Sequence, residues 1–165
     1  MTSSPAVNPA VNPQWTRAWT AAAYRLGAAG PCAYDCYRLM AAVLRTEAGL
    51  DVPLHADQVP ARPGSKQAFL KNASEMLADE RLWRPVARPE PFDAVKLRFG
   101  AFNCHVGVVV AVWPRAAHLP PAGRMLHIHE GINSTVEDWH SRRWQNRVVG
   151  FRRFIGGRIK GRRNG

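Results

Sequence analysis

The spacing of apolar residues changes from a helical to a strand-like period along this chain, and that change limits the folds it can adopt. In PCAYDCYRLMAAVL (31–44), apolar residues recur every three or four positions, which is typical of a helix with one buried face. From Asp93 onward the apolar residues alternate with polar ones or run continuously, as in strands. Helices first and strands afterwards favour an α+β domain in which N-terminal helices pack on an antiparallel sheet.

Three helices are predicted in the first half of the chain. The first spans residues 15–26, where two tryptophans and two alanines have helical spacing that predicts packing against the core. The second begins at Cys36, directly after the good capping residue Asp35, and ends near Gly49. The third covers residues 65–80 and has one apolar face.

Four strands are predicted in the second half. HVGVVVAVW (105–113) is apolar throughout, which indicates a central strand buried on both faces. Residues 93–99 alternate and predict a strand with one buried face, and shorter strands are predicted at 125–129 and 147–154. The basic, proline-containing segment RLWRPVARPEP (81–91) is predicted to be a loop.

Length and composition indicate one domain. With 165 residues the chain can bury a core without disulfides, and three cysteines are too few for a disulfide framework. We expect an extended arm over 1–13, the folded domain over 14–155 and a basic tail over 156–165. The N-terminus has no basic and apolar segments of a signal peptide, and no apolar run approaches the ~18 residues that span a bilayer. We therefore expect synthesis in the cytoplasm and no membrane insertion.

The positive charge is concentrated at the C-terminal end. The formal net charge is +11, yet residues 1–141 hold 14 Lys or Arg against 12 Asp or Glu, and the other nine basic residues lie between Arg142 and Arg163. Such a tail could contact nucleic acid, a cell-envelope polymer or an acidic partner protein. It is also typical of a solvated chain end. Because the excess charge is confined to the C-terminal end of the chain, nucleic-acid binding is the less favoured function.

Cys36, His105 and His127 are candidates for a catalytic set. A thiol in the first turn of a helix is near the positive end of the helix dipole, which lowers its pKa and favours the nucleophilic thiolate. Such a nucleophile needs a base, and the base needs a third group to orient it. His105 opens the central strand and His127 lies in the next strand, where an antiparallel neighbour could bring it close. Each of these residues could instead be structural.

A zinc site is the alternative for the same region. Cys104 precedes His105, and His129 follows His127 by two residues, on the same face of its strand. Zinc uses cysteine and histidine, but usually takes four protein ligands, or three and a water. We expect no metal and no other cofactor.

Several motifs together resemble the NlpC-type cell-wall peptidases, a papain-like family of cysteine enzymes. YRLGAAGPCAYDCYRLMAAVLRTEAGLDVP (24–53) resembles their catalytic segment, in which a tyrosine and a Gly-rich turn precede Asp-Cys at a helix start. PFDAVKLRF, HVGVVV and MLHIHEG are similar to the three strands that follow, and WQNRVVGFRRF resembles the end of the members found in bacteriophage tails. The similarity covers about residues 15–155 in the family's order.

The resemblance implies a papain-like α+β fold and hydrolysis of an amide bond in peptidoglycan stem peptides. It makes Cys36 the nucleophile, His105 the general base and His127 the orienting residue, with His129 as the rival for that third role. Tyr24 would line the cleft, and Asp35 would position the loop or the substrate. Arg38 stands where the family usually has glycine, and Phe92 replaces the glycine before the strand aspartate.

Three functions follow from this sequence. The first is a phage tail-associated cysteine peptidase that aids cell-wall penetration, with tail-tip or hub proteins as partners and the virion as its location. The second is a structural tail-tip or tail-assembly protein with a vestigial peptidase fold. The third is a nucleic-acid-binding protein that uses the Arg-rich C-terminus.

Overall fold

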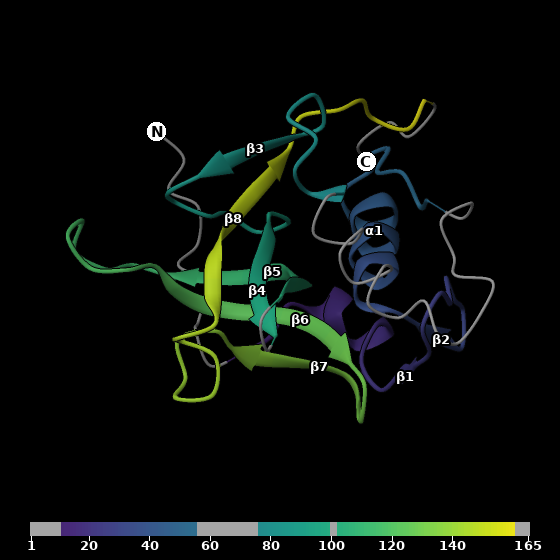
Figure 1. The fold of residues 1–165 in the computed structure, drawn as a ribbon, viewed down its shortest axis with the longest axis horizontal. Helices are drawn as coiled ribbons and strands as arrows, with labels where there is room; N and C mark the ends of the chain where they lie inside the picture. The colour runs from purple at the N-terminus through teal and green to yellow at the C-terminus, as the bar shows by residue number, and fades with distance from the viewer. Residues whose placement is uncertain (1–10, 56–75, 100–101, 161–165) are drawn as a thin grey trace.

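An antiparallel sheet of six strands forms the centre of the computed structural model, which describes residues 11–55, 76–99 and 102–160, without the side chains of residues 102–104. One α-helix, α1 (Cys36–Glu47), packs on β5 and β6 (Figure 1). The strand order is β3-β8-β4-β5-β6-β7. Their bounds are β3 (Trp83–Val86), β4 (Ala94–Phe99), β5 (Phe102–Trp113), β6 (Ala122–His129), β7 (Ile132–Asp138) and β8 (Val148–Phe154).

The helix α1 begins and ends where the sequence predicted. The Asp35 carboxylate accepts a hydrogen bond from the Arg38 backbone N–H at 2.8 Å, which satisfies one of the unpaired donors of the first turn. Gly49 adopts a φ of 66°, in the left-handed region that favours glycine, and the Leu50 N–H donates to the Leu44 carbonyl at 3.1 Å. Local capping chemistry therefore sets both ends of the helix.

The central strand β5 is covered on both faces, as its apolar sequence predicted. Val106, Val108 and Val110 belong to the core cluster that contains the apolar side of α1. Val109 belongs to a second cluster on the other face, with Met125, Trp139, Trp144 and Phe151 among its members. The strand β4 is also buried on both faces rather than on one, because α1 and the aromatic cluster cover opposite sides of the sheet.

The predicted helix over residues 15–26 is wrong. The chain forms a short 3₁₀ helix (Gln14–Ala18) and then β1 (Ala23–Tyr24), which pairs in parallel with β2 (Ala33–Tyr34). Ser134 of β7 holds this segment, since its carbonyl accepts from the Ala21 N–H at 2.8 Å and its N–H donates to the Ala22 carbonyl at 2.9 Å. These long-range bonds replace helical ones, although the two tryptophans pack against the core as predicted.

Two strands of the six-stranded sheet lie outside those predicted from the sequence. β3 falls within the segment expected to be a loop, where Trp83 is buried and the strand pairs with β8. β7 pairs with β6 and has a mixed polar sequence that gave no strand signal. The predicted helix over 65–80 lies mostly outside the described residues, but Met76 and Leu77 near its end are buried in the core.

The start of α1 contains a buried ion pair. The Arg38 guanidinium is 2.6 Å from the Asp35 carboxylate, and both side chains have no exposed surface. Arg38 also donates to the His55 carbonyl at 2.6 Å, and the Tyr37 hydroxyl donates to the Pro53 carbonyl at 2.9 Å. Arg38, at the position where the resemblance leads one to expect glycine, thus ties the segment after α1 to the beginning of the helix.

Phe92 occupies a backbone conformation that favours glycine. Its φ is 71°, in the left-handed region, and its N–H donates to the Val109 carbonyl at 2.9 Å. The ring packs against Trp15 at a centroid distance of 5.2 Å. The turn before β4 therefore keeps the geometry expected of a glycine, while the side chain adds a contact to the N-terminal segment.

The residues at the C-terminal end of the described chain contact the segment that follows α1. The Asp51 N–H donates to the Gly157 carbonyl at 2.8 Å, and the Ile159 N–H donates to the Gly49 carbonyl at 2.9 Å. The predicted bounds of the arm (1–13) and of the tail (156–165) stay predictions. No helix among the described residues is long and apolar enough to cross a membrane.

Replacing Asp35 with alanine is expected to destabilise the protein by about 3 to 5 kcal/mol, because it leaves the Arg38 charge buried without its partner. Asp51→Ala is the matched control, since the Arg45–Asp51 pair is largely exposed and should contribute less than about 1 kcal/mol. Urea unfolding followed by circular dichroism measures both. Equal losses in the two variants would contradict the importance of the buried pair.

Candidate active site

Two histidines on neighbouring strands form a buried hydrogen-bonded pair. His105 Nε2 lies 3.0 Å from His127 Nδ1, and the two side chains have almost no exposed surface. Gly107 lies opposite His127 in the β5–β6 register, and a Cβ there would come within 3.1 Å of the His127 Cβ. The absence of a side chain at Gly107 therefore provides the space that the His127 side chain occupies. The other ring nitrogen of His127, Nε2, lies 2.6 Å from Oε2 of Glu137 on β7.

Aromatic rings enclose this pair. The Trp144 ring stacks on His105 at a centroid distance of 5.8 Å and meets His127 edge-on at 4.9 Å. Phe99 meets His105 edge-on at 5.4 Å. The guanidinium of Arg147 lies over Phe99 at 5.1 Å, so a cation borders the enclosure. The pair is thus shielded from water by rings that also restrict its orientation.

Burial keeps both imidazoles neutral at physiological pH. It lowers the pKa of His105 well below the ordinary value, and the nearby His127, His129 and Arg147 lower this pKa further. Burial also lowers the pKa of His127 to about 4, against the opposing effect of the Glu137 carboxylate, while His129 and Arg143 add to the lowering. A neutral His105 has a free lone pair, which is the form that a general base requires.

Cys36 occupies the first turn of α1, as predicted, and its side chain is buried in the core cluster on the α1 face of the sheet. Along β5 and β6, His105 and His127 alternate with residues of that cluster. Their side chains therefore project from the opposite face of the sheet, where Leu97 and Met125 lie. The hydrogen bond of the His105 ring goes to His127. The structure thus brings the two histidines together. A contact between the Cys36 thiol and the His105 ring stays a prediction.

The rival histidine, His129, has different partners. Its Nδ1 lies 2.8 Å from the Glu130 carbonyl oxygen, and its Nε2 lies 3.2 Å from Nη2 of Arg143. In the described part of the chain, the His105 ring makes its hydrogen bond to His127 and not to His129. This geometry favours His127 for the orienting role.

Tyr24 and Asp35 lie on the N-terminal side of α1. Tyr24 is in β1, paired with Tyr34, and packs against the core cluster that contains Cys36. The Asp35 carboxylate accepts from the Gly27 N–H at 3.0 Å as well as from Arg38. Burial raises the pKa of Asp35, although its bonds to Arg38 and Gly27 oppose that effect. Because Asp35 is fully buried, its position favours holding the loop over contact with substrate.

Neither Glu137 nor Arg143 stands in a sequence pattern that predicts a functional role. Glu137 lies diagonal to His127 across the β6–β7 pair, which only the pairing of β7 reveals. Arg143 donates to Oε1 of Glu137 at 3.3 Å. In the described ranges no group of three or more His, Cys, Asp or Glu side chains is arranged to hold a metal. The Cys104 side chain, part of the zinc alternative, lies outside the described residues.

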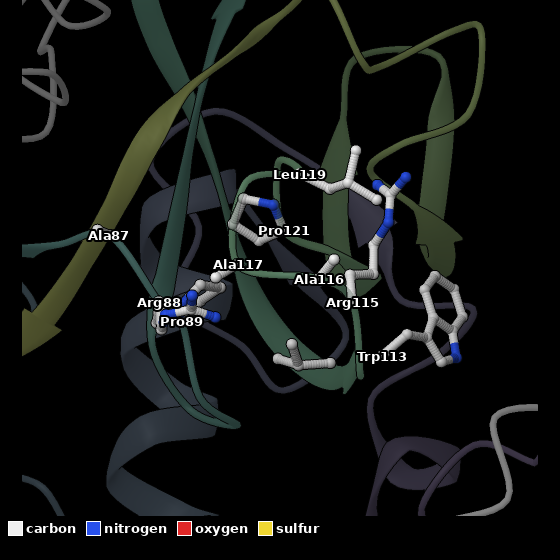
Figure 2. Close-up of a pocket in the computed structure, with 10 residues that line it drawn as sticks. Ala87, Arg88, Pro89, Trp113, Arg115, Ala116, Ala117, Leu119 and Pro121 are labelled. Atoms are coloured by element: carbon white, nitrogen blue, oxygen red, sulfur yellow. The ribbon is translucent and has the colours of Figure 1, made fainter.

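A separate cavity of about 230 Å³ lies at the other end of β5. Figure 2 shows Trp113 at the end of the strand and Arg115 and Leu119 in the loop that follows, with Arg88 and Pro89 on the facing segment. His105 is near the beginning of β5 and does not line this cavity. The cavity is therefore distinct from the histidine pair.

Comparison with known proteins supports the fold. No family model matches the sequence, and no curated protein matches it. A crystal structure from Staphylococcus aureus subsp. aureus Mu50, described as similar to a lipoprotein of the NLP/P60 family, superposes with a TM-score of 0.52 at 19% identity. The match covers 84% of this chain and 38% of that chain, so the chain spans well under half of that protein. The predicted α+β fold of NlpC type, with helix and antiparallel sheet, is confirmed.

The stability of the protein is expected to fall as the pH drops from about 7 to about 4. In the unfolded chain a histidine takes up a proton near pH 6.5, whereas native His127 does so near pH 4, so acid favours unfolding. For His127 alone this amounts to about 3 kcal/mol over that range. Urea unfolding at a series of pH values measures it.

His127→Asn should reduce this pH dependence, and His118→Asn, which changes an exposed loop histidine, should leave it unchanged. A parent-like pH dependence in His127→Asn would contradict the assignment.

Proposed function

We propose that this protein is an NlpC-type cysteine peptidase that hydrolyses an amide bond in peptidoglycan stem peptides. The observation that carries the proposal is the buried His105–His127 pair, which lies on the two strands against whose other face the Cys36 helix packs. The shared fold with an NLP/P60 structure and the order of the sequence motifs support it. Cys36 would be the nucleophile, His105 the base and His127 the residue that orients the base.

The hydrogen bonds of His105 define how it would act. Its Nε2 is hydrogen-bonded to His127, so Nδ1 is the nitrogen left to take the proton of the thiol. The Cys36 thiolate would then attack the amide carbon, and backbone N–H groups at the start of α1 would stabilise the oxyanion. The imidazolium would protonate the leaving amine, and water would hydrolyse the resulting thioester.

This chemistry requires the Cys36 thiol and His105 Nδ1 to meet at a site that substrate can enter. Cys36 lies on the α1 face of the sheet and His105 on the opposite face, and they are 7% and 3% exposed, so both the first turn of α1 and the beginning of β5 would rearrange when substrate binds. Catalytic hydrogen bonds often tighten only in the complex with substrate. The same burial favours a second candidate function, a structural tail-tip or tail-assembly protein that retains the fold with little activity.

We propose further that the enzyme belongs to a phage tail, where it would aid cell-wall penetration and contact tail-tip or hub proteins. The support is the sequence resemblance of the Asp-Cys segment and of WQNRVVGFRRF to the tail-associated members. Mass spectrometry of purified particles should find the protein in the tail fraction. Its recovery only among non-particle proteins of the lysate would contradict a virion location.

Cys36→Ala is expected to abolish cleavage of purified sacculi and of defined muropeptides, because it removes the nucleophile. Cys32→Ala is the matched control, since Cys32 is exposed and lies outside the helix, and it should keep parental activity. Mass spectrometry of the products would identify the bond that is cut. A Cys36→Ala variant as active as the parent would exclude the cysteine peptidase.

The coupling of Cys36 to His105 can be measured without substrate. The rate of Cys36 alkylation by iodoacetamide, followed against pH in a background in which Cys32 and Cys104 are both replaced by alanine, reports the pKa of the thiol. His105→Ala should shift this profile to higher pH if the imidazole reaches the thiol. An unchanged profile together with inactive parent protein would favour the structural function.

A further inference from the structure

We infer that Glu137 is a positioning residue that fixes the tautomers of both buried histidines, with Arg143 holding its carboxylate in place. The inference rests on the proposed function for its catalytic consequence, but the tautomers themselves are a property of the resting protein. Glu137 lies on β7, and neither the sequence motifs nor the structural comparison draws attention to it.

The Glu137 carboxylate determines where the proton of His127 lies. An ionised carboxylate only accepts hydrogen bonds, so the 2.6 Å contact from His127 Nε2 to Glu137 Oε2 requires the proton to be on Nε2. Neutral imidazole carries one proton, and His127 remains neutral because burial lowers its pKa. Its Nδ1 is therefore an acceptor.

His127 in turn determines the tautomer of His105. Because His127 Nδ1 accepts, the 3.0 Å contact with His105 requires the proton of His105 to be on Nε2. His105 Nδ1 then has no proton and carries the lone pair that a general base needs. The carboxylate at one end of the chain thus determines which nitrogen is basic at the other end.

Arg143 holds the Glu137 carboxylate in the position where it accepts from His127. Its Nη1 donates to Glu137 Oε1 at 3.3 Å, so the two carboxylate oxygens have different partners. Its guanidinium lies 5.0 Å from the centre of the Trp144 ring, which stacks on His105. One cation therefore contacts both the carboxylate and the ring that covers the histidines.

Removing the charge of Glu137 should allow the protons of His127 and His105 to move to their other ring nitrogens. The side-chain amide in a Glu137→Gln variant could either accept from His127 or donate to it, and donation would place the His127 proton on Nδ1. That proton would face His105 Nε2 and leave the His105 proton on Nδ1, where the ring is no longer a base towards the thiol.

Nitrogen NMR of histidine-labelled protein at pH 7 tests this directly, because protonated and unprotonated ring nitrogens differ widely in chemical shift. The parent should show the Nε2–H tautomer for both His105 and His127. Glu137→Gln should show mixed or reversed tautomers, and Asp138→Asn, the neighbouring residue that pairs with Arg124, should match the parent. Circular dichroism checks that each variant is folded.

Kinetics on defined muropeptides provide the second measurement. Glu137→Gln should lower kcat by about tenfold or more with little change in KM, a range typical of groups that orient a reactive residue, and Asp138→Asn should change neither. Parent-like tautomers in folded Glu137→Gln would overturn the inference. Shifted tautomers in a protein whose parent is inactive would support the role of Glu137 and count against the proposed function instead.

Discussion

Burial of β5 on both faces is the constraint on which the rest of the structure depends. Val106 and Val108 require the cover that α1 provides, and Val109 requires the aromatic cluster on the opposite side. The backbone of β5 is bonded to β4 on one edge and β6 on the other, which fixes the register of both neighbours. The His105–His127 contact is a direct product of that register, since it joins two side chains on adjacent strands.

Two sets of polar groups, buried except for the partly exposed Glu137, lie on opposite faces of this sheet. The Asp35–Arg38 pair is on the α1 side, where it caps the helix and ties the segment up to His55 to it. The chain from His105 through His127 to Glu137 is on the other side, under Trp144. Burial of polar groups is costly unless each has a partner, so both sets restrict the orientation of their members. The first set orders the neighbourhood of Cys36, and the second fixes the orientation of His105.

Features with a local cause were predictable from particular residues. Asp35 and Gly49 act through capping and a left-handed turn, and the continuous apolar run of β5 left little alternative to a buried strand. The helix expected over residues 15–26 failed because Ser134, more than 100 residues away, supplies backbone bonds that local spacing cannot reveal. Trp83 lies in a segment that the sequence predicts to be a loop, because the proline and arginine residues around it mask the strand that pairs with β8.

The sequence by itself determined the α+β class, the helix that starts at Cys36, and the histidines that could serve it, because each depends on local spacing or on residue type. The tertiary structure decided which of these residues meet. It brought His105 into contact with His127, and His127 into contact with Glu137. It also buried Cys36, in the first turn of α1, in the core cluster on the other face of the sheet. The physical reason is that strand register and the packing of a helix on one face are set by contacts between residues far apart in the chain, for which the sequence carries no local signal.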